Sequence, residues 1–582
     1  MRSLRRLIKF MAPYKVWAII APSLMALEVA MDLAQPRLLQ TIVDVGIANQ
    51  DADLVLRTLL IMVGVAVVGA IGGIGCTIYA TRAAMAFGAD VRASLFRQVQ
   101  ELSFSDLARL ETGRLVTRLT NDVDQVQHAA AMLLRILVRA PLLVVGSLIM
   151  AVVTSPRLSL LIFALSPLLV GTFWIIASRA QKLFSVVQDR LDRVNITMLE
   201  NLAGVRVIQA FVRSAHEISR FGRANDDYMR ETVRASVLVA TMMPIMMLLI
   251  NLGTVGVLWW GGLLVQAGTV EVGQILAFIN YLMQMMGSLM MVGMLVMRIS
   301  RADASAERVL EVLDTEPAIQ DPADPEELGA IEGRVEFDHV TFSYDGEEVE
   351  PVLQEISFTV ESGETVAIIG ATGSGKSTLV HLIPRLYDVS EGRVMIDGHD
   401  VRNVRQDDLR RVSATVLQDT VLFTGTIRDN IRYACPDATD EQVEAAARVA
   451  QAHDFVTGFP DGYDTLVGQR GVNLSGGQKQ RLAIARALIS EPTILIMDDC
   501  TSAVDATTEA AIVEALSDWP GASTRFVITH CVGSVLGADR IFVLDGGRLA
   551  AEGSHQELLT SSPIYHEIVT SQLGTEEIAS VG

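Results

Sequence analysis

The chain is poor in cysteine and in lysine, and each shortage narrows what the protein can be. Its 582 residues include only four cysteines, with no pair at the spacing of metal ligands, so we expect reduced thiols and no disulfide framework. They are Cys76, Cys435, Cys500 and Cys531. Lysine occurs 5 times against 42 arginines, a bias that, with abundant alanine and valine, favours a GC-rich bacterial source. The net charge of −20 argues against a nucleic-acid partner, because phosphate binding needs clustered basic residues.

Apolar residues, in contrast, make up 50% of the chain, and the mean hydropathy is +0.38. A soluble globular chain rarely reaches that value, which points to membrane spans. Six stretches meet the length of about 20 residues that a bilayer requires. They are 16–38, 58–80, 131–153, 158–178, 236–260 and 273–297. The first has charges before it but no small-residue cleavage site, so we expect a retained anchor and not a signal peptide.

The basic residues predict how these spans are oriented. The first 15 residues hold five of them, segment 81–130 holds six and segment 179–234 holds ten. The loops 39–56 and 262–272 hold none, and the turn "TSPR" holds one. Because Lys and Arg accumulate on the cytoplasmic side, both termini and both long segments are predicted to face the cytoplasm of a multi-pass cell-membrane protein.

The two long cytoplasmic segments are rich in helix formers, with apolar residues at helical spacing. About 25 helical residues out and 25 back would extend roughly 35 Å beyond the membrane. Such stalks suit a protein whose membrane part reaches down to a cytoplasmic domain. The alternative is a coiled hairpin that packs only on itself.

The composition changes near residue 315, where an acidic stretch with three prolines begins. We predict a helical membrane domain over 1–315, a linker over 316–334 and a further domain over 335–582. In the last part, the apolar runs "TVAIIG", "TILIMD" and "RIFVLD" alternate with helical patterns. This arrangement predicts an α/β domain with a mainly parallel sheet.

A phosphate-binding loop opens that domain. The stretch "GATGSGKST" fits G-x-x-x-x-G-K-[ST] between a predicted strand and a predicted helix, where a chance glycine-rich turn is the lesser alternative. Lys376 is expected to reach the β- and γ-phosphates of ATP, and Ser377 to offer its hydroxyl to Mg²⁺. Asp498, at the end of "ILIM", is expected to hold the same Mg²⁺, although an aspartate there could also cap a helix. The motif comprises Gly370, Ala371, Thr372, Gly373, Ser374, Gly375, Lys376, Ser377 and Thr378.

A second phosphate-binding end is predicted at "LSGGQ", where a serine and two glycines precede a helix. Two such cradles in one small domain cannot easily grip one nucleotide. The pattern therefore predicts two domains arranged head to tail, each cradle facing the P-loop of the other. The residues concerned are Ser475, Gly476, Gly477 and Gln478.

These motifs, in this order and after six spans, resemble a half-transporter of the ATP-binding cassette family with the exporter-type fold, over essentially the whole chain. The resemblance implies that Tyr344 stacks on adenine and that Gln418 senses both Mg²⁺ and the membrane domain. It implies that Asp505 communicates across the dimer and that His530 contacts the γ-phosphate. By residue type alone, Tyr344 could be a strand-packing tyrosine and His530 a core histidine.

The stalks resemble those of the same family. The stretches "DLARLETGRLVTRLTNDVDQVQ" and "ENLAGVRVIQAF" resemble the loops that contact the nucleotide domains, with a solvated charged helix as the alternative. Gln469 stands where the family usually has a glutamate.

Asp499 is the position that departs most from the family pattern, which places a glutamate base there. Aspartate is shorter by one C–C bond, about 1.5 Å. A misplacement near 1 Å can cost about 10²-fold in rate, and loss of a general base roughly 10²–10⁴-fold. The resemblance thus predicts a heterodimer in which this chain holds ATP, hydrolyses it slowly and lends its "LSGGQ" to an active partner. A homodimer with two slow sites is the alternative.

The sequence contains less information about the transported substrate. Methionines crowd the fifth and sixth spans and could line an adaptable cavity for hydrophobic or amphipathic compounds such as lipids, fatty acids or drugs. Ordinary packing or lipid-facing methionine explains them equally well. Glu28 and Asp32 share one helix face, and could attract a cationic substrate, pair with an arginine such as Arg139, or be solvated near the outer end of the span. Export follows only from the resemblance, and import on the same fold is the alternative.

Overall fold

The computed structural model of the protein describes residues 2–344, 350–517, 519, 524–530 and 532–571. The chain forms two compact units. The first comprises Met1–Gln100 and Thr112–Thr315, and the second comprises Glu101–Glu111 and Glu316–Gly582. A short piece of the long segment 81–130 therefore belongs with the second unit.

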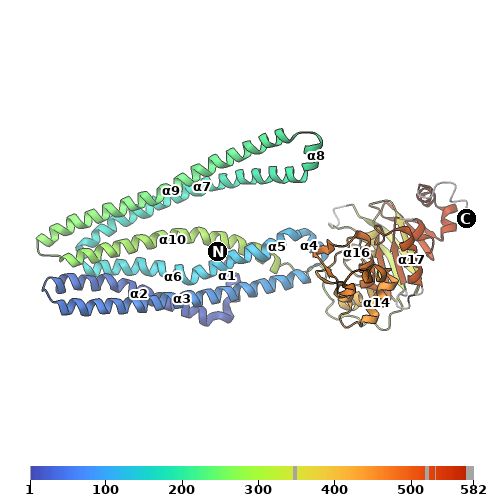
Figure 1. Cartoon of the computed structure of the whole chain (residues 1–582), viewed down its shortest axis with the longest axis horizontal. Coiled ribbons are helices and arrows are strands. Elements are labelled where there is room, and N and C mark those ends of the chain that lie inside the picture. Colours follow the sequence, from blue (N-terminus) through green and yellow to red (C-terminus); the bar gives the residue numbers. More distant parts are fainter. Residues whose placement is uncertain (1, 345–349, 518, 520–523, 531, 572–582) are drawn as a thin grey trace. The chain divides into compact units, whose positions relative to one another are not determined.

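The first unit is entirely helical in its described part (Figure 1). Six of its helical stretches are long and apolar enough to cross a membrane, and each overlaps one predicted span, which confirms the six-span prediction. They are Arg2–Ile47, Ala52–Glu101, Thr112–Thr154, Pro156–Ala203, Ser214–Gln266 and Val272–Val292. The elements are α1 (Arg2–Leu7), η1 (Ile8–Tyr14), α2 (Lys15–Thr41), η2 (Ile42–Ile47), α3 (Ala52–Glu101), α5 (Thr112–Thr117), η3 (Arg118–Asp122), α6 (Val123–Thr154), α7 (Pro156–Ala203), α8 (Val205–Ala210), α9 (Ser214–Gln266) and α10 (Val272–Leu313).

Local capping sets where two of these helices begin. Ser155 caps α7 by accepting from the Leu158 N–H, and Pro156 follows at the first helical position, where its missing N–H costs nothing. Glu271 and Gln274 form a capping box at the start of α10. These caps fix the residues at which α7 and α10 begin.

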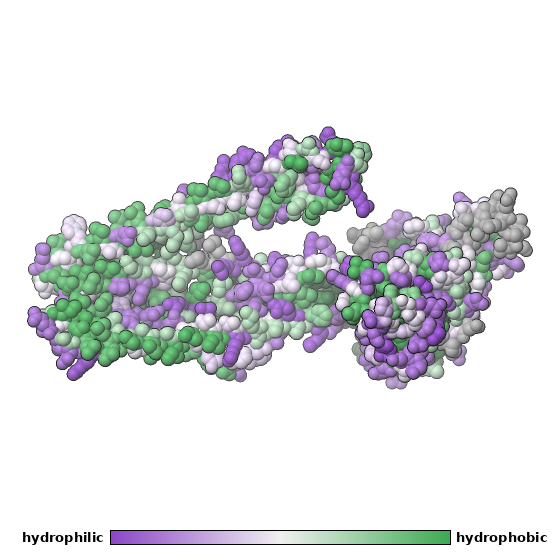
Figure 2. Space-filling model, in the orientation of Figure 1, coloured by the Kyte–Doolittle hydropathy of each residue, from purple (hydrophilic) through white to green (hydrophobic). Residues whose placement is uncertain are grey.

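Within the first unit, α6 packs along α10, α7 packs along α9, and α2 contacts both α6 and α10. Figure 1 shows α7 and α9 as a helical hairpin closed by α8. Two ion pairs, Arg118–Glu311 at 2.7 Å and Arg308–Asp122, tie η3 to the C-terminal part of α10. Apolar side chains gather on the part of this unit that holds the six spans (Figure 2), as expected of a surface that faces lipid or another membrane subunit.

The second unit contains two main sheets. A six-stranded sheet has the order β12-β11-β3-β10-β9-β6, in which all neighbours are parallel except the β11–β12 pair at one edge. Its central strands are apolar without alternation because both faces are buried. This sheet confirms the predicted mainly parallel α/β core. Its strands are β3 (Thr365–Gly370), β6 (Ser413–Val416), β9 (Ile494–Asp498), β10 (Thr524–Ile528), β11 (Arg540–Asp545) and β12 (Arg548–Gly553).

A four-stranded antiparallel sheet, β2-β1-β4-β5, was not predicted. Register shifts interrupt its β1–β2 and β1–β4 ladders, so the period-two signal of these strands is broken in the sequence. The residues after Thr315 pack on this unit, since Asp321 accepts from the Gln406 N–H at 3.0 Å and Glu326 bridges to Val404. The strands are β1 (Val335–Phe342), β2 (Leu353–Val360), β4 (Glu391–Ile396) and β5 (His399–Asp400), with the short pair β7 (Gly425–Thr426) and β8 (Leu466–Val467) elsewhere.

The remaining elements of this unit are helices. They are α4 (Phe104–Leu110), α11 (Lys376–His381), α12 (Gln406–Val412), α13 (Ile427–Ile431), η4 (Arg432–Ala434), α14 (Asp440–Val449), α15 (His453–Thr457), η5 (Gly462–Asp464), η6 (Gln469–Gly471), α16 (Gly476–Leu488), α17 (Ala506–Ser517), α18 (Val532–Val535) and α19 (His555–Ser561).

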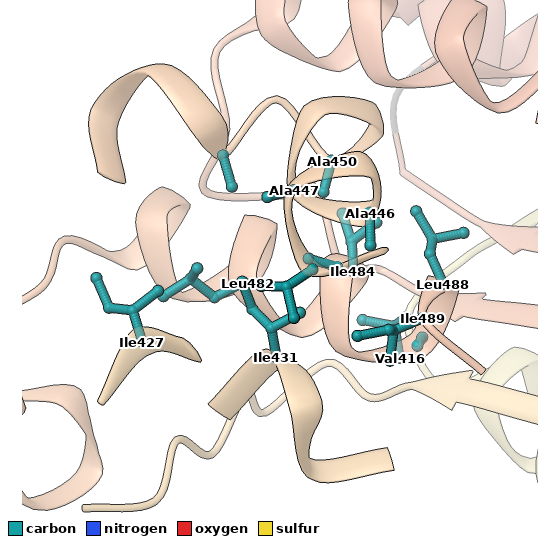
Figure 3. Packing of buried hydrophobic residues seen from close by; sticks show 14 of the residues in the cluster. Val416, Ile427, Ile431, Ala446, Ala447, Ala450, Leu482, Ile484, Leu488 and Ile489 are labelled. Carbon is teal, nitrogen blue, oxygen red and sulfur yellow. The ribbon is translucent and has the colours of Figure 1, made fainter. Parts of the chain in front are cut away.

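One hydrophobic cluster fixes the position of α16. Leu482, Ile484 and Leu488 of α16 are fully buried against α13, α14 and Val416 of β6 (Figure 3). The cluster is built largely from alanine and branched aliphatic residues, so helices approach closely. It therefore determines where the N-terminus of α16, and with it Ser475, lies.

We expect Leu482→Ala to destabilise the second unit by about 2–5 kcal/mol, because a fully buried leucine leaves a cavity that the rigid cluster cannot close. The measurement is the thermal unfolding midpoint of the full chain in lipid nanodiscs, followed by loss of nucleotide-analogue binding. The control Leu466→Ala, at a leucine that is 71% exposed, should change stability by about 0.5 kcal/mol or less. Equal effects of the two substitutions would contradict the assigned core.

Candidate nucleotide-binding site

The P-loop follows β3, between the parallel neighbours β10 and β11. Gly373 and Gly375 adopt φ of +84° and +97°, a region that side chains avoid. A Cβ on Gly375 would lie 2.7 Å from Leu353 Cδ2, whereas a Cβ on Gly373 would enter open space. The loop therefore packs closely on β2 at Gly375 and leaves its backbone accessible at Gly373, as a loop that binds phosphates through its N–H groups must.

Lys376 is the cation of this cradle. Its Nζ donates to the carbonyls of Gly370 at 3.0 Å and Ala371 at 2.9 Å, and the residue is buried. Burial lowers the pKa of Lys376, while the charges of Asp499 and Asp498 oppose that shift. An additional anion beside this ammonium would stabilise it, so the site fits a polyphosphate.

Ser377 and Asp498 supply oxygen atoms at the edge of the loop. The Ser377 hydroxyl donates to Asp498 Oδ1 at 2.8 Å, and Asp498 is almost fully buried at the end of β9. His381 Nε2 lies 3.5 Å from the other Asp498 oxygen. One hydroxyl and one carboxylate suit Mg²⁺, which is commonly held by few protein oxygens together with substrate phosphates. The described residues contain no group of three His, Cys, Asp or Glu side chains that could hold a metal alone.

Asp499 and Gln418 meet beside this pair. Gln418 Nε2 donates to Asp499 Oδ2 at 3.0 Å. The Asp499 N–H donates to the Ile528 carbonyl at 3.0 Å, and its φ is +47°, which aspartate tolerates better than most residues. Both the backbone and the carboxylate of Asp499 are therefore fixed. His530 follows the end of β10, the strand that lies between β3 and β9, and is an exposed residue.

Tyr344 lies at the other side of the P-loop, half-exposed after β1. Its hydroxyl hydrogen-bonds the Thr378 hydroxyl at 2.9 Å. The ring contacts Phe342 and Tyr387 edge to face, with centroids 4.9 and 5.1 Å apart. Tyr387 in turn contacts Phe104 of α4 at 6.3 Å.

The helix α4 is held in place through Asp106. Its carboxylate accepts from the Ser103 hydroxyl at 2.6 Å and from the Ala318 N–H at 2.9 Å. Burial would raise the pKa of Asp106, but these hydrogen bonds outweigh it and keep the pKa below its usual value. The sequence analysis did not predict that Tyr387 and Phe104 lie near Tyr344, because neither residue belongs to a recognised motif.

The "LSGGQ" segment forms the N-terminus of α16. Ser475 caps the helix and forms a capping box with Gln478. A Cβ on Gly477 would lie 2.7 Å from the Ala503 carbonyl, so close packing on the 503–504 segment already requires glycine there. Among the described residues, no hydrogen bond or ion pair joins Ser475–Gln478 to the loop 370–378, so the two cradles remain separate within one chain.

Asp505, another residue that the sequence singled out, forms hydrogen bonds with its near neighbours in the chain. Its carboxylate accepts from the Thr507 hydroxyl at 2.5 Å and from the Thr508 N–H and hydroxyl, which holds its pKa well below the usual range. Gln469 is exposed in η6.

Burial raises the pKa of the Cys500 thiol to about 12, so this cysteine stays protonated. Cys76 and Cys435 are unpaired, and Cys531 lies outside the described residues.

Arg486 of α16 anchors the segment that follows Gln418, and no motif in the sequence predicts this contact. It donates to the carbonyls of Val421 and Asn430, both at 2.9 Å. Its guanidinium also lies 5.6 Å from the Phe423 ring centroid and 5.7 Å from that of Tyr433. The loop that carries Gln418 is thereby attached to the helix that carries Ser475.

Two families of sequences match this chain. Residues 18–289 match the ABC transporter transmembrane region and residues 353–502 match the ABC transporter family. The chain belongs to the ABC transporter family and has the exporter-type fold, in which ATP hydrolysis is coupled to transport.

Individual relatives agree with this assignment. The chain is 41% identical to the uncharacterized ABC transporter ATP-binding protein YfiB of Bacillus subtilis, over 98% of this chain and 99% of that one. It is 34% identical to the ATP-dependent lipid A-core flippase of Syntrophus aciditrophicus, over 84% and 81% of the two chains. The solved structure of a bacterial Atm1-family ABC exporter with ATP bound superimposes with a TM-score of 0.80 at 28% identity, covering 97% of this chain and 99% of that one.

The aromatic contact of Tyr344 can be tested at Tyr387. Tyr387→Ala removes the ring that positions Tyr344 and should weaken binding of an adenine nucleotide several-fold, because each aromatic pair contributes about 0.5–1.5 kcal/mol. Tyr387→Phe keeps the ring and should bind as the unmodified protein does. Binding of a fluorescent ATP analogue to the full chain measures both. If both variants bind alike, Tyr387 does not position Tyr344.

Proposed function

We propose that this chain is one half of an ATP-driven transporter in the bacterial cell membrane, with its second unit in the cytoplasm. The observation that carries the proposal is the constellation of P-loop, Lys376, Ser377, Asp498 and Tyr344 in a chain that also has six membrane-spanning helices. ATP, when bound with Mg²⁺, supplies the free energy of its terminal phosphoanhydride bond.

In this proposal, each residue of the site has a defined task. The cradle and Lys376 bind the phosphates, Ser377 and Asp498 hold Mg²⁺, and Tyr344 stacks on the adenine. His530 contacts the γ-phosphate, and Gln418 links the site to the movements of the membrane helices. The Ser377–Asp498 distance and the cradle open at Gly373 support these tasks.

We further propose that Asp499 makes this chain's own site slow. A carboxylate shorter than glutamate by about 1.5 Å could reach the attacking water only if the backbone moved. The Asp499 N–H is bonded to β10 and the carboxylate to Gln418, so such a movement would break two hydrogen bonds. Nucleotide binding does not depend on Asp499, so the site holds ATP.

The two separated cradles favour assembly with a second half-transporter. Ser475 and its glycines would complete the site of the partner, and a partner with an efficient base would hydrolyse most of the ATP. We therefore propose a heterodimer. A homodimer with two slow sites is the alternative.

The proposed cargo is hydrophobic or amphipathic, such as a lipid, a fatty acid or a drug, and is exported. The lipid A-core flippase among the relatives and the exporter-type fold support this class and direction. Import on the same fold is the alternative for direction.

The head-to-tail assembly predicts different effects at the two cradles. Lys376→Ala removes the charge that binds the phosphates and should weaken ATP binding at this chain's site about 10–100-fold. Ser475→Ala should leave binding there unchanged and reduce hydrolysis at the partner's site. Photo-crosslinking of labelled ATP to each distinguishable subunit measures this. Equal losses at both sites from either variant would contradict the assembly.

The slow-site proposal predicts that Asp499→Asn lowers total ATPase activity by about a tenth or less, because a site on the order of 10² slower contributes little to turnover. Replacing the equivalent base of the partner should abolish most turnover. Steady-state hydrolysis is measured for this chain alone, the partner alone and both co-expressed. If this chain alone forms a fully active dimer that Asp499→Asn inactivates, the homodimer alternative is correct.

A further inference from the structure

A cavity of about 730 Å³ lies among the membrane-spanning parts of α2, α3 and α6. Four charged side chains line it, and charges inside a membrane are costly enough to indicate function. They are Glu28 and Asp32 of α2 and Arg135 and Arg139 of α6. Much of the remaining wall is apolar, including Met31, Ala70 and Ile74.

Three of these charges are paired with one another. Arg139 donates through Nη1 to Glu28 and through Nη2 to Asp32, the latter at 3.1 Å. Of the alternatives for the two carboxylates, pairing with Arg139 is the one that the structure shows. Glu28 is also held between helices, because its Oε2 lies 2.8 Å from where a Cβ on Gly73 would stand. The two carboxylates share one guanidinium, so a cationic ligand would compete with Arg139 for them.

Arg135 differs from the other three. It lines the same cavity one helical turn before Arg139, is only partly exposed, and has no hydrogen bond or ion pair with any residue that the structure describes. A guanidinium has five N–H donors. Burying these donors in a low-dielectric site costs free energy unless they find hydrogen-bond acceptors. The unmet need in this cavity is therefore for an anion.

The position of Arg135 fits a lipid-like molecule. It lies near the cytoplasmic end of the predicted span 131–153, whereas the cavity wall extends toward the outer end along α2 and α3 as far as Gln35 and Val65. A headgroup at Arg135 would sit near the inner surface of the membrane, and a hydrocarbon chain could run along Ile74 and Ala70.

We propose that this cavity binds a single-chain amphipathic anion, with its carboxylate or phosphate against Arg135 and its chain along α3. The inference rests on the proposed function, whose substrate class it narrows from amphipathic compounds to acidic ones. Glu28, Asp32 and Arg139 form the ion-paired middle of the wall, and Arg135 brings the four formal charges of the cavity to zero.

The test measures equilibrium binding of four radiolabelled probes of equal chain length to the full chain, assembled with its partner where it has one, in nanodiscs of zwitterionic lipid. The probes are an alkyl carboxylate, a phosphate monoester, a primary amine and an alcohol. We expect the two anions to bind most tightly, and the tighter of the two identifies the headgroup.

Five variants locate the site. Arg135→Gln should weaken binding of both anions about tenfold or more and leave the alcohol unchanged, whereas Arg135→Lys should retain the preference. Arg57→Gln, at an exposed arginine of α3 away from the cavity, should have no effect. Ala70→Leu should weaken all probes by filling the cavity. Glu28→Gln removes one of the carboxylates that neutralise Arg139 and should tighten anion binding, a gain that misfolding cannot imitate.

Preferred binding of the amine, or anion binding unchanged by both Arg135→Gln and Glu28→Gln, would overturn the inference. In either case, probe-stimulated ATPase activity would leave the proposed transport of amphipathic compounds standing. If no probe binds and none stimulates ATPase activity, the proposed substrate class and this inference both fail.

Discussion

The parallel pairing of β3, β10 and β9 is the constraint on which the nucleotide site depends. In this register Ile528 of β10 lies opposite both Ile368 of β3 and Asp498 of β9. The carboxyl ends of all three strands therefore meet at one edge, and the P-loop, Asp498, Asp499 and His530 emerge there together. A slip of one residue would shift the end of one strand by about 3.3 Å and separate the residues that emerge there.

That edge is connected to the rest of the second unit by two sets of contacts of different kinds. On one side, Arg486 attaches the segment after Gln418 to α16 through hydrogen bonds and aromatic contacts. On the other side, Tyr344 reaches α4 through Tyr387 and Phe104. The residues of the proposed nucleotide site are thus positioned by α16 and α4 through side chains that lie outside the site. The second set therefore joins Tyr344 to α4, a segment that lies between two membrane helices in the sequence but belongs to the second unit.

The membrane unit shows a different balance of forces. Its helices lack a hydrophobic driving force against lipid, so small residues and polar contacts decide their packing. Gly72 and Gly73 let α3 approach α2 closely, and the Arg139 pairs with Glu28 and Asp32 connect α2 to α6. The same ion pairs leave Arg135 as the charge without a partner in the described part of this cavity. Close packing and charge pairing together therefore shape both the helix bundle and the cavity.

The sequence alone determined the six spans, the mainly parallel core and the glycine-rich loop that follows β3. These features depend on local properties, namely apolar length, apolar runs without alternation and a short motif, so they can be predicted without knowing any distant contact. The sequence also identified Asp499 as unusual, because aspartate lacks one methylene of the glutamate that the family pattern has at this position.

Only the tertiary structure decided what surrounds these residues. The hydrogen bond between Gln418 and Asp499 joins residues 81 positions apart, and the pairing of Arg139 with Glu28 joins residues 111 positions apart. The sequence left the roles of Glu28 and Asp32 open for this reason, and it gave no sign of Tyr387, Phe104 or Arg486 as neighbours of the site. Long-range contacts of this kind arise from the packing of whole helices and strands, and no pattern within a single element encodes them.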